Sequence, residues 1–219
     1  MSFHPWDVSS SQAINIQEDL SKRVVKTGGP EKVSNVCGVD VSFPSKSTAR
    51  AAAVVLSFPH MGVVEKAVSE VPVSFPYIPG LLAFREGEAV LSAVERLKTK
   101  PDLFLFDAQG LAHPRRLGLA SHIGVLLNKS SIGIAKSRLV GSYQDLGSRI
   151  GDKSPLIDNG EVVGTVVRTK PGSAPIFISI GHKISLEEAV RLTLVCTLRG
   201  QRLPRPTLLA HNLCSGLKV

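Results

Sequence analysis

Glu86 is a carboxylate on the apolar side of a predicted helix, Leu82 to Leu97. At about 100° of rotation per residue, its side chain lies about 40° from that of Val90 and shares this side with Ala83. Glu88 falls on the opposite side, where solvent is expected. A carboxylate turned toward a core costs several kcal/mol unless it is paired or binds a cation. Glu86 is therefore predicted to form a buried ion pair, to lie at the edge of the apolar stripe, or to bind a metal ion.

Asp107 and Asp40 stand in strand-like sequence. Asp107 follows the apolar run Leu103 to Phe106, at the carboxyl end where α/β sheets bind ligands. The alternative for this residue is a turn-forming aspartate. Asp40 stands between Val39 and Val41 in a second strand-like run, and its alternative is an outward-facing polar residue on a half-exposed sheet. Each position is ambiguous when it is considered alone.

The three carboxylates together indicate more than each one does. Two carboxylates about 4 Å apart repel by roughly 4 kcal/mol at an effective dielectric near 20, and a divalent cation removes this cost. Oxygen ligands favour Mg²⁺, with Mn²⁺ as a substitute, over zinc. Such ions activate water and stabilise the leaving oxyanion at phosphodiesters. If Asp40, Glu86 and Asp107 converge, we expect a Mg²⁺ site that cuts a phosphodiester.

The charge of the chain is uneven. The net charge is +8, and residues 108–219 carry 15 basic and 6 acidic side chains, against 11 and 12 in residues 1–107. A basic surface attracts polyanions, of which nucleic acid is the commonest, whereas the alternative is solubility alone. We therefore expect a nucleic-acid partner.

The composition also bounds the cellular setting. The three cysteines, Cys37, Cys196 and Cys214, have no CxxC spacing, which favours free thiols in a reducing compartment over disulfides or a zinc site. The N-terminus lacks a signal pattern, and the chain has no run of about 18 apolar residues that could cross a bilayer. We expect a cytoplasmic monomer that does not enter membranes.

The elements that must position the carboxylates alternate along the chain. An antiparallel meander of three strands is predicted first, followed by alternating helices and strands, and this order is typical of a mixed α/β sheet flanked by helices. No linker or repeat divides residues 1–219, so one domain is expected. The predicted helices are 13–24, 82–97, 117–127 and one opening at Ser185 and ending at Gly200; the strands are 36–43, 49–57, 63–73, 103–106, 132–135, 162–168 and 176–180. The tail, 204–219, is expected to be a basic turn with a short helical or irregular piece.

Five sequence blocks resemble the endonuclease V family, the nucleases that act beside deaminated adenine. The blocks are GVDVSF at 38–43, PYIPGLLAFREGEAVL at 76–91, DAQGLAHPRRLGLASHIGV at 107–125, SIGIAKSRLVG at 131–141 and PTLLAH at 206–211. The resemblance runs through almost the whole chain. It implies a ribonuclease H-like fold with acidic residues at adjacent strand ends that bind Mg²⁺.

The resemblance also implies residue roles. Asp40, Glu86 and Asp107 match the acidic metal positions, and His211 matches a fourth residue of the metal site. His113 and Lys136 match positions that contact the phosphates around the cut. The remaining matches concern the substrate: Tyr77, Ile78 and Pro79 match a wedge beside the flipped base, while Gly80, Leu82, Ala108, Gly110 and Leu119 match the pocket for that base. Arg115 and Arg116 are further candidates for phosphate contacts, or else solvated charges.

The chain departs from the family pattern at three places. Ala108 stands where the family usually has glycine, which adds a methyl where the backbone should approach the base. Ser130 and Ser131 replace a common Pro-Thr, and Leu208 replaces a common arginine before Ala210-His211 in the tail. None of these changes touches the expected metal ligands.

The predicted function is therefore a Mg²⁺-dependent endonuclease that recognises inosine in nucleic acid, with DNA favoured over RNA as the substrate, and initiates repair. The resemblance implies hydrolysis of the second phosphodiester on the 3′ side, leaving 3′-hydroxyl and 5′-phosphate. Two alternatives stay open: another ribonuclease H-like nuclease, specific for hybrids or junctions, and an inosine-binding module without catalysis. A phosphatase with Asp40 as nucleophile is disfavoured, because Ser42 and not a second aspartate follows two residues later.

Overall fold

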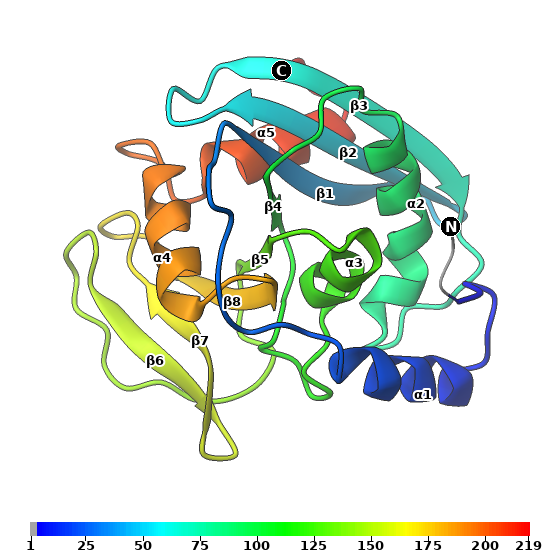
Figure 1. Cartoon of the computed structure of the whole chain (residues 1–219), viewed down its shortest axis with the longest axis horizontal. Coiled ribbons are helices and arrows are strands. Elements are labelled where there is room, and N and C mark those ends of the chain that lie inside the picture. Colours follow the sequence, from blue (N-terminus) through cyan, green and yellow to red (C-terminus); the bar gives the residue numbers. More distant parts are fainter. Residues whose placement is uncertain (1–3) are drawn as a thin grey trace.

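The computed structural model describes residues 4–219, and a single eight-stranded sheet forms its centre (Figure 1). The strand order is β3-β2-β1-β4-β5-β8-β7-β6. Strands β1, β4 and β5 are parallel, whereas every other neighbouring pair is antiparallel. The strands are β1 Asn35–Ser45, β2 Thr48–Ser57, β3 Val63–Pro72, β4 Leu103–Phe106, β5 Ser131–Ala135, β6 Lys153–Asp158, β7 Glu161–Val167 and β8 Ile176–His182.

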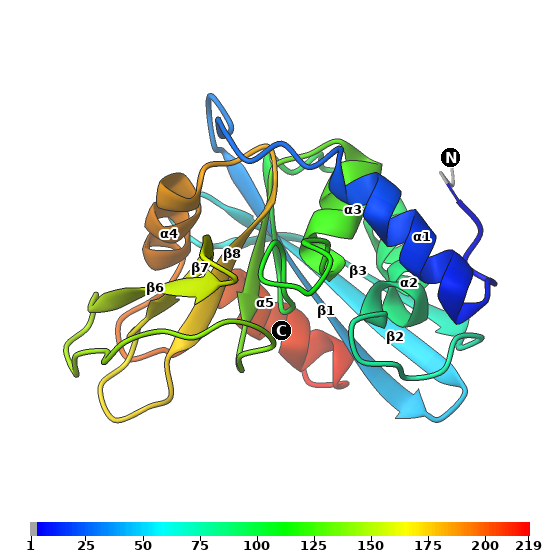
Figure 2. The same ribbon diagram turned by 90° about the horizontal axis from the view of Figure 1, so that it is seen from below.

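Helices cover both faces of the sheet. The helices are α1 Ser10–Ser21, α2 Leu82–Glu95, α3 Leu119–Leu127, α4 Leu186–Val195 and α5 Arg205–Cys214. Figure 2 shows α5 on the side of the sheet opposite to α2 and α3, with α1 outside α3. Alternate strand residues feed the two cores: Leu105 belongs to the core under α4 and α5, and Phe106 to the core under α2 and α3. No helix among residues 4–219 is both long and apolar enough to cross a membrane.

The mixed sheet with an antiparallel meander and parallel strands confirms the predicted fold class. Between residues 35 and 135 the predicted elements are present with ends shifted by at most two residues. Helix α1 lies earlier than predicted because Ser9 forms a capping box with Gln12. Helix α4 does begin after Ser185, whose hydroxyl accepts from the Glu188 amide, but it ends at Val195, well before Gly200.

The remaining elements to compare with the prediction are the edge strand β6 and the tail. Strand β6 was not predicted, since Pro155 and short length weaken its strand pattern; it is an edge strand, where proline is tolerated. Of the two alternatives predicted for the tail, the structure shows the helical one, α5, which begins at Arg205 without a preceding basic turn. This helix packs on β1 and β2, so its apolar residues Leu209 and Leu213 gain a buried surface that the local sequence does not reveal.

Gly38 sets how closely α5 approaches the sheet. A Cβ at this position would lie 2.0 Å from the Pro206 carbonyl oxygen, which is far inside van der Waals contact. Gly38→Ala is expected to push α5 away from β1 and to lower the free energy of unfolding by roughly 1–3 kcal/mol. Thermal melting measures the effect. Gly62→Ala is the control, because a Cβ there meets only the Ser57 hydroxyl at 3.4 Å; equal losses in both variants would contradict the expectation.

Candidate active site

Asp40 and Asp107 lie on neighbouring strands at the same level of the sheet. Strands β1 and β4 pair in parallel with Val39 opposite Phe106, so the next residues of the two strands are adjacent. The Asp107 amide donates to the Val39 carbonyl oxygen at 3.0 Å, which extends the ladder to the aspartate. The carboxyl end of β4 therefore places Asp107 beside Asp40, at the edge of the sheet where a ligand site is predicted.

Glu86 is buried, and the negative charges of Asp40 and Asp107 act on its carboxyl group. Burial first, and then the charges of Asp40 and Asp107, raise the pKa of its carboxyl group to about 8, although the charge of Arg85 opposes this rise. Burial also raises the pKa of Asp107, as does the charge of Asp40. The charge of Arg85 does not offset these effects, so the buried ion pair considered for Glu86 is not what the structure shows. Glu86 and Asp107 thus lie near Asp40 in surroundings where burial disfavours their ionised forms.

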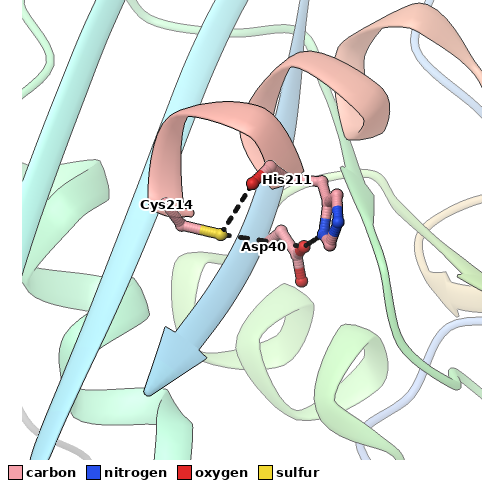
Figure 3. A group of neighbouring side chains, drawn as sticks. All are labelled: Asp40, His211 and Cys214. Atoms are coloured by element: carbon pink, nitrogen blue, oxygen red, sulfur yellow. Dashed lines mark hydrogen bonds and ion pairs between the residues drawn. The ribbon is translucent and has the colours of Figure 1, made fainter. Parts of the chain in front are cut away.

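His211 and Cys214 approach the same aspartate from α5 (Figure 3). The His211 Nδ1 atom lies 2.7 Å from Asp40 Oδ2, and the Cys214 thiol donates to the His211 carbonyl at 3.2 Å. Asp40, His211 and Cys214 each offer one atom that could bind a metal ion, and these three atoms lie within 4.8 Å of one another. Burial, and next the charge of Asp40, raises the pKa of the Cys214 thiol to about 12, so it remains neutral at pH 7.

Lys136 follows β5 and its ammonium group contacts Asp107 Oδ2. This ion pair opposes the rise in the pKa of Asp107 caused by burial. The side chain is 37% exposed, so the ammonium group is accessible from solvent while it neighbours the carboxylates. A cation in this place can contact a phosphate that approaches the acidic cluster.

A cavity of about 340 Å³ lies beside the carboxylates. It extends from Asp107 to the segment before α2, and Tyr77 at its rim is 70% exposed. The structure places seven of the predicted substrate residues in its lining: Tyr77, Ile78, Pro79, Gly80, Leu82, Ala108 and Leu119. The predicted metal-site and phosphate residues Asp107, His113 and Lys136 also line it. The cavity and the acidic cluster therefore form one continuous site.

His113 is buried and its role as a phosphate contact stays a prediction. The Arg115 amide donates to its Nδ1 atom at 3.2 Å, so Nε2 carries the proton and donates to the Gly80 carbonyl oxygen at 3.0 Å. Burial, and then the charge of Arg115, lowers the pKa of the imidazole to about 4. At pH 7 the ring is therefore neutral, and its hydrogen bond to Gly80 joins two residues of the cavity wall.

Gly110 does not line the cavity, and Arg115 and Arg116 bind groups of the protein. Gly110 lies behind the cavity, where a Cβ would be 2.1 Å from the Ile180 carbonyl oxygen, so close packing on β8 requires glycine here. Arg116 pairs with Asp158 and Glu161, each at 2.8 Å. A phosphate would have to compete with these carboxylates for its guanidinium group. Arg115 likewise donates within the protein, to Gln17 Oε1 at 2.6 Å and to the Gly80 carbonyl oxygen at 2.7 Å.

Eight further residues that were not predicted as site residues line the cavity. They include Gln17 on α1 and the segment Ser137, Arg138 and Leu139 after β5. The last three fall within the block at 131–141, yet their residue types alone carried no signal. Gln17 carried one, because it follows Ala13 by four residues and so faces the core with it, by the same helix phase that selected Glu86.

Comparisons with known proteins agree with this geometry. The family model for Endonuclease V matches residues 18–212. The Endonuclease V of Trichormus variabilis is 50% identical over 97% of this chain and 97% of its own length. The crystal structure of the Endonuclease V from Streptomyces avermitilis superposes with a TM-score of 0.90 at 41% identity, covering 96% of this chain and 93% of that one.

A third relative has been solved with a nucleic acid. The Ciona intestinalis Endonuclease V, in complex with a 24mer DNA containing an inosine followed by a ribo-adenosine, matches with a TM-score of 0.81 at 31% identity, covering 94% of this chain and 96% of that chain. The acidic cluster, the adjoining cavity and these matches over nearly the full length agree with one another. The chain belongs to the endonuclease V family of nucleases.

Proposed function

We propose that this protein is a Mg²⁺-dependent endonuclease that recognises inosine in DNA and hydrolyses the second phosphodiester bond on its 3′ side, which initiates repair of deaminated adenine. The observation that carries the proposal is a cavity of about 340 Å³, large enough for a base, with an exposed aromatic residue at its rim and Asp107 of the three carboxylates in its lining. The Ciona relative binds inosine-containing DNA, which supports this substrate. The position of the cut rests on the family resemblance.

The donor atoms suit Mg²⁺. Asp40, Glu86 and Asp107 offer carboxylate oxygens, and the raised pKa values of Glu86 and Asp107 reflect negative charge that burial leaves uncompensated. A hard cation in this cluster would remove that cost, and His211 would support Asp40 through its hydrogen bond. When bound, Mg²⁺ supplies activation of water and stabilisation of the leaving oxyanion. Mn²⁺ has the same ligand preference and is expected to substitute.

The chain's own groups position the substrate. Tyr77, Ile78 and Pro79 enter the strand beside the extruded base, and this contact offsets part of the stacking lost on flipping, a cost of a few kcal/mol. The base occupies the cavity, while Lys136 holds the phosphate next to Asp107. Water adds to phosphorus and the P–O3′ bond breaks, which leaves a 3′-hydroxyl and a 5′-phosphate.

A labelled oligonucleotide with one inosine tests the proposal. Cleavage is expected with Mg²⁺ or Mn²⁺ and is expected to fall to background with EDTA, because the carboxylates then hold no cation. Equal cutting in both conditions would exclude the metal mechanism. The same strand with adenine, an RNA/DNA hybrid and a four-way junction serve as controls. Indifference to inosine would favour a hybrid- or junction-specific nuclease, and binding without cleavage in any condition would favour a non-catalytic module.

A further inference from the structure

Three side chains converge on a single backbone carbonyl, that of Gly80. Gln17 Nε2 donates to this oxygen at 3.0 Å, His113 Nε2 at 3.0 Å and Arg115 Nη2 at 2.7 Å. A carbonyl oxygen ordinarily accepts one or two hydrogen bonds. The donors come from α1 and from the segment between β4 and α3, so two distant parts of the chain hold this peptide.

Gly80 closes the turn that presents the wedge residues. The Leu81 amide donates to the Ile78 carbonyl at 2.9 Å, with Pro79 and Gly80 at the two central positions. Gly80 has a φ of +80°, the conformation that a type II turn requires at its second central residue. The turn fixes its own backbone, but the carbonyl of Gly80 points away from it and is what anchors the turn to the rest of the protein.

Gln17 is the residue that joins both segments lining the cavity. Its side chain is only 1% exposed, and it contributes to the cavity lining itself. Besides Gly80, its Nε2 atom contacts the Leu117 carbonyl at 3.4 Å, and its Oε1 atom accepts from Arg115 Nε at 2.6 Å. One buried amide therefore connects the turn that carries the wedge to the segment that carries Ala108.

We propose that Gln17 is a positioning residue for base recognition, which holds the wedge turn at a fixed separation from the opposite segment of the cavity. A planar base fits between the two segments only if their separation is maintained after the base leaves its stack. Without the Gln17 amide, the turn keeps its internal hydrogen bond but loses a donor that ties it to α1. This inference rests on the proposed function, since it assigns a residue to the same cavity.

Two substitutions separate the contributions of the amide. Gln17→Glu keeps an acceptor for Arg115 and removes both donations from Nε2, to Gly80 and to Leu117. Gln17→Met removes every hydrogen bond of the side chain at nearly constant volume. Gln12→Ala is the matched control on the same helix, because Gln12 closes the capping box with Ser9 and lies outside the cavity lining.

The experiment measures binding and cleavage separately for inosine and adenine oligonucleotides of equal length. For Gln17→Glu and Gln17→Met we expect the Kd for the inosine strand, measured without divalent metal, to rise about tenfold, the loss of roughly one buried hydrogen bond. The Kd for the adenine strand should stay unchanged, since basic side chains remain in place. The KM for cleavage should rise in parallel, whereas kcat at saturating substrate should change less than about threefold.

The outcomes are distinguishable. A melting temperature of each variant near that of the wild type shows that the fold is intact, and Gln12→Ala calibrates the effect of weakening α1 alone. If Gln17→Glu binds inosine as tightly as the wild type, or if Gln12→Ala loses as much affinity, the inference is overturned. If the wild type does not distinguish inosine from adenine, the proposed function fails instead, whatever the variants do.

Discussion

Asp107→Asn is expected to lower the rate of cleavage at inosine by at least about 10³-fold, which corresponds to roughly 4 kcal/mol of transition-state stabilisation. The substitution keeps the shape of the side chain but removes a charge from the cluster that holds the cation. It also removes the ion pair with Lys136, so the ammonium group loses the partner that places it beside the site. Single-turnover cleavage with saturating protein measures the chemical step.

Binding separates a catalytic effect from a structural one. Asp107→Asn should bind the inosine oligonucleotide in EDTA within about threefold of the wild type, because base recognition uses the cavity and not the charge. Asp102→Asn is the matched control: this aspartate lies at the opposite end of β4 and accepts hydrogen bonds from the Ser34 and Asn35 amides. A loss below tenfold for Asp107→Asn, or an equal loss for Asp102→Asn, would contradict the assignment.

Glu86→Gln should abolish cleavage and yet stabilise the metal-free protein at pH 8. The pKa of Glu86 is about 8 in the folded state and 4.5 as the ordinary value. Between these values the folded state retains a proton that the unfolded state has lost. The free energy of unfolding of the wild type therefore falls as the pH rises through this window, by up to about 1.4 kcal/mol per pH unit. Glutamine carries no such proton, so the variant escapes this loss.

Thermal melting at two pH values with excess EDTA measures the effect. At pH 8 we expect Glu86→Gln to melt on the order of 5 °C above the wild type, corresponding to roughly 2 kcal/mol. Near pH 4.5 the two should differ little, since the carboxyl group is then largely neutral in the folded state. Added Mg²⁺ should raise the melting temperature of the wild type at pH 8 and leave the variant unchanged.

Glu88→Gln supplies the control for this result. Glu88 is exposed on the opposite side of the same helix, so its substitution should alter neither cleavage nor the pH dependence of stability. A variant Glu86→Gln that is less stable than the wild type at pH 8 would show that the carboxylate is compensated within the fold. In that case its role as a metal ligand would lose its physical basis.

Local patterns in the sequence predicted the elements of this fold where they are strong. The unbroken apolar run of β4 predicted its bounds, since a short apolar run without alternation is typical of a strand that is covered on both faces. Helix phase found Glu86, because a charge on an apolar face is costly. The same phase places Gln17 on the buried side of α1, but a neutral amide costs less to bury, so its position alone does not indicate a functional role.

Non-local contacts account for what the sequence did not predict. Strand β6 depends on pairing with β7 across a turn, and Pro155 conceals its pattern. Helix α5 is specified by its packing on β1, and the approach of His211 to Asp40 depends on the contact of Gly38 with Pro206. Neither the individual spacing of these residues nor their type contains that information. The resemblance implied that the site residues converge, whereas local patterns in the sequence did not. The contacts themselves are visible only in the folded chain.

The position of His211 has a consequence for the order in which the site is completed. Asp40, Glu86 and Asp107 belong to the first half of the sequence, whereas α5 begins at Arg205. During synthesis on the ribosome the chain therefore carries the acidic residues long before it carries their histidine partner. The face of β1 around Gly38 also stays uncovered until α5 has been synthesised. The contact between His211 and Asp40 can therefore form only after α5 has been synthesised.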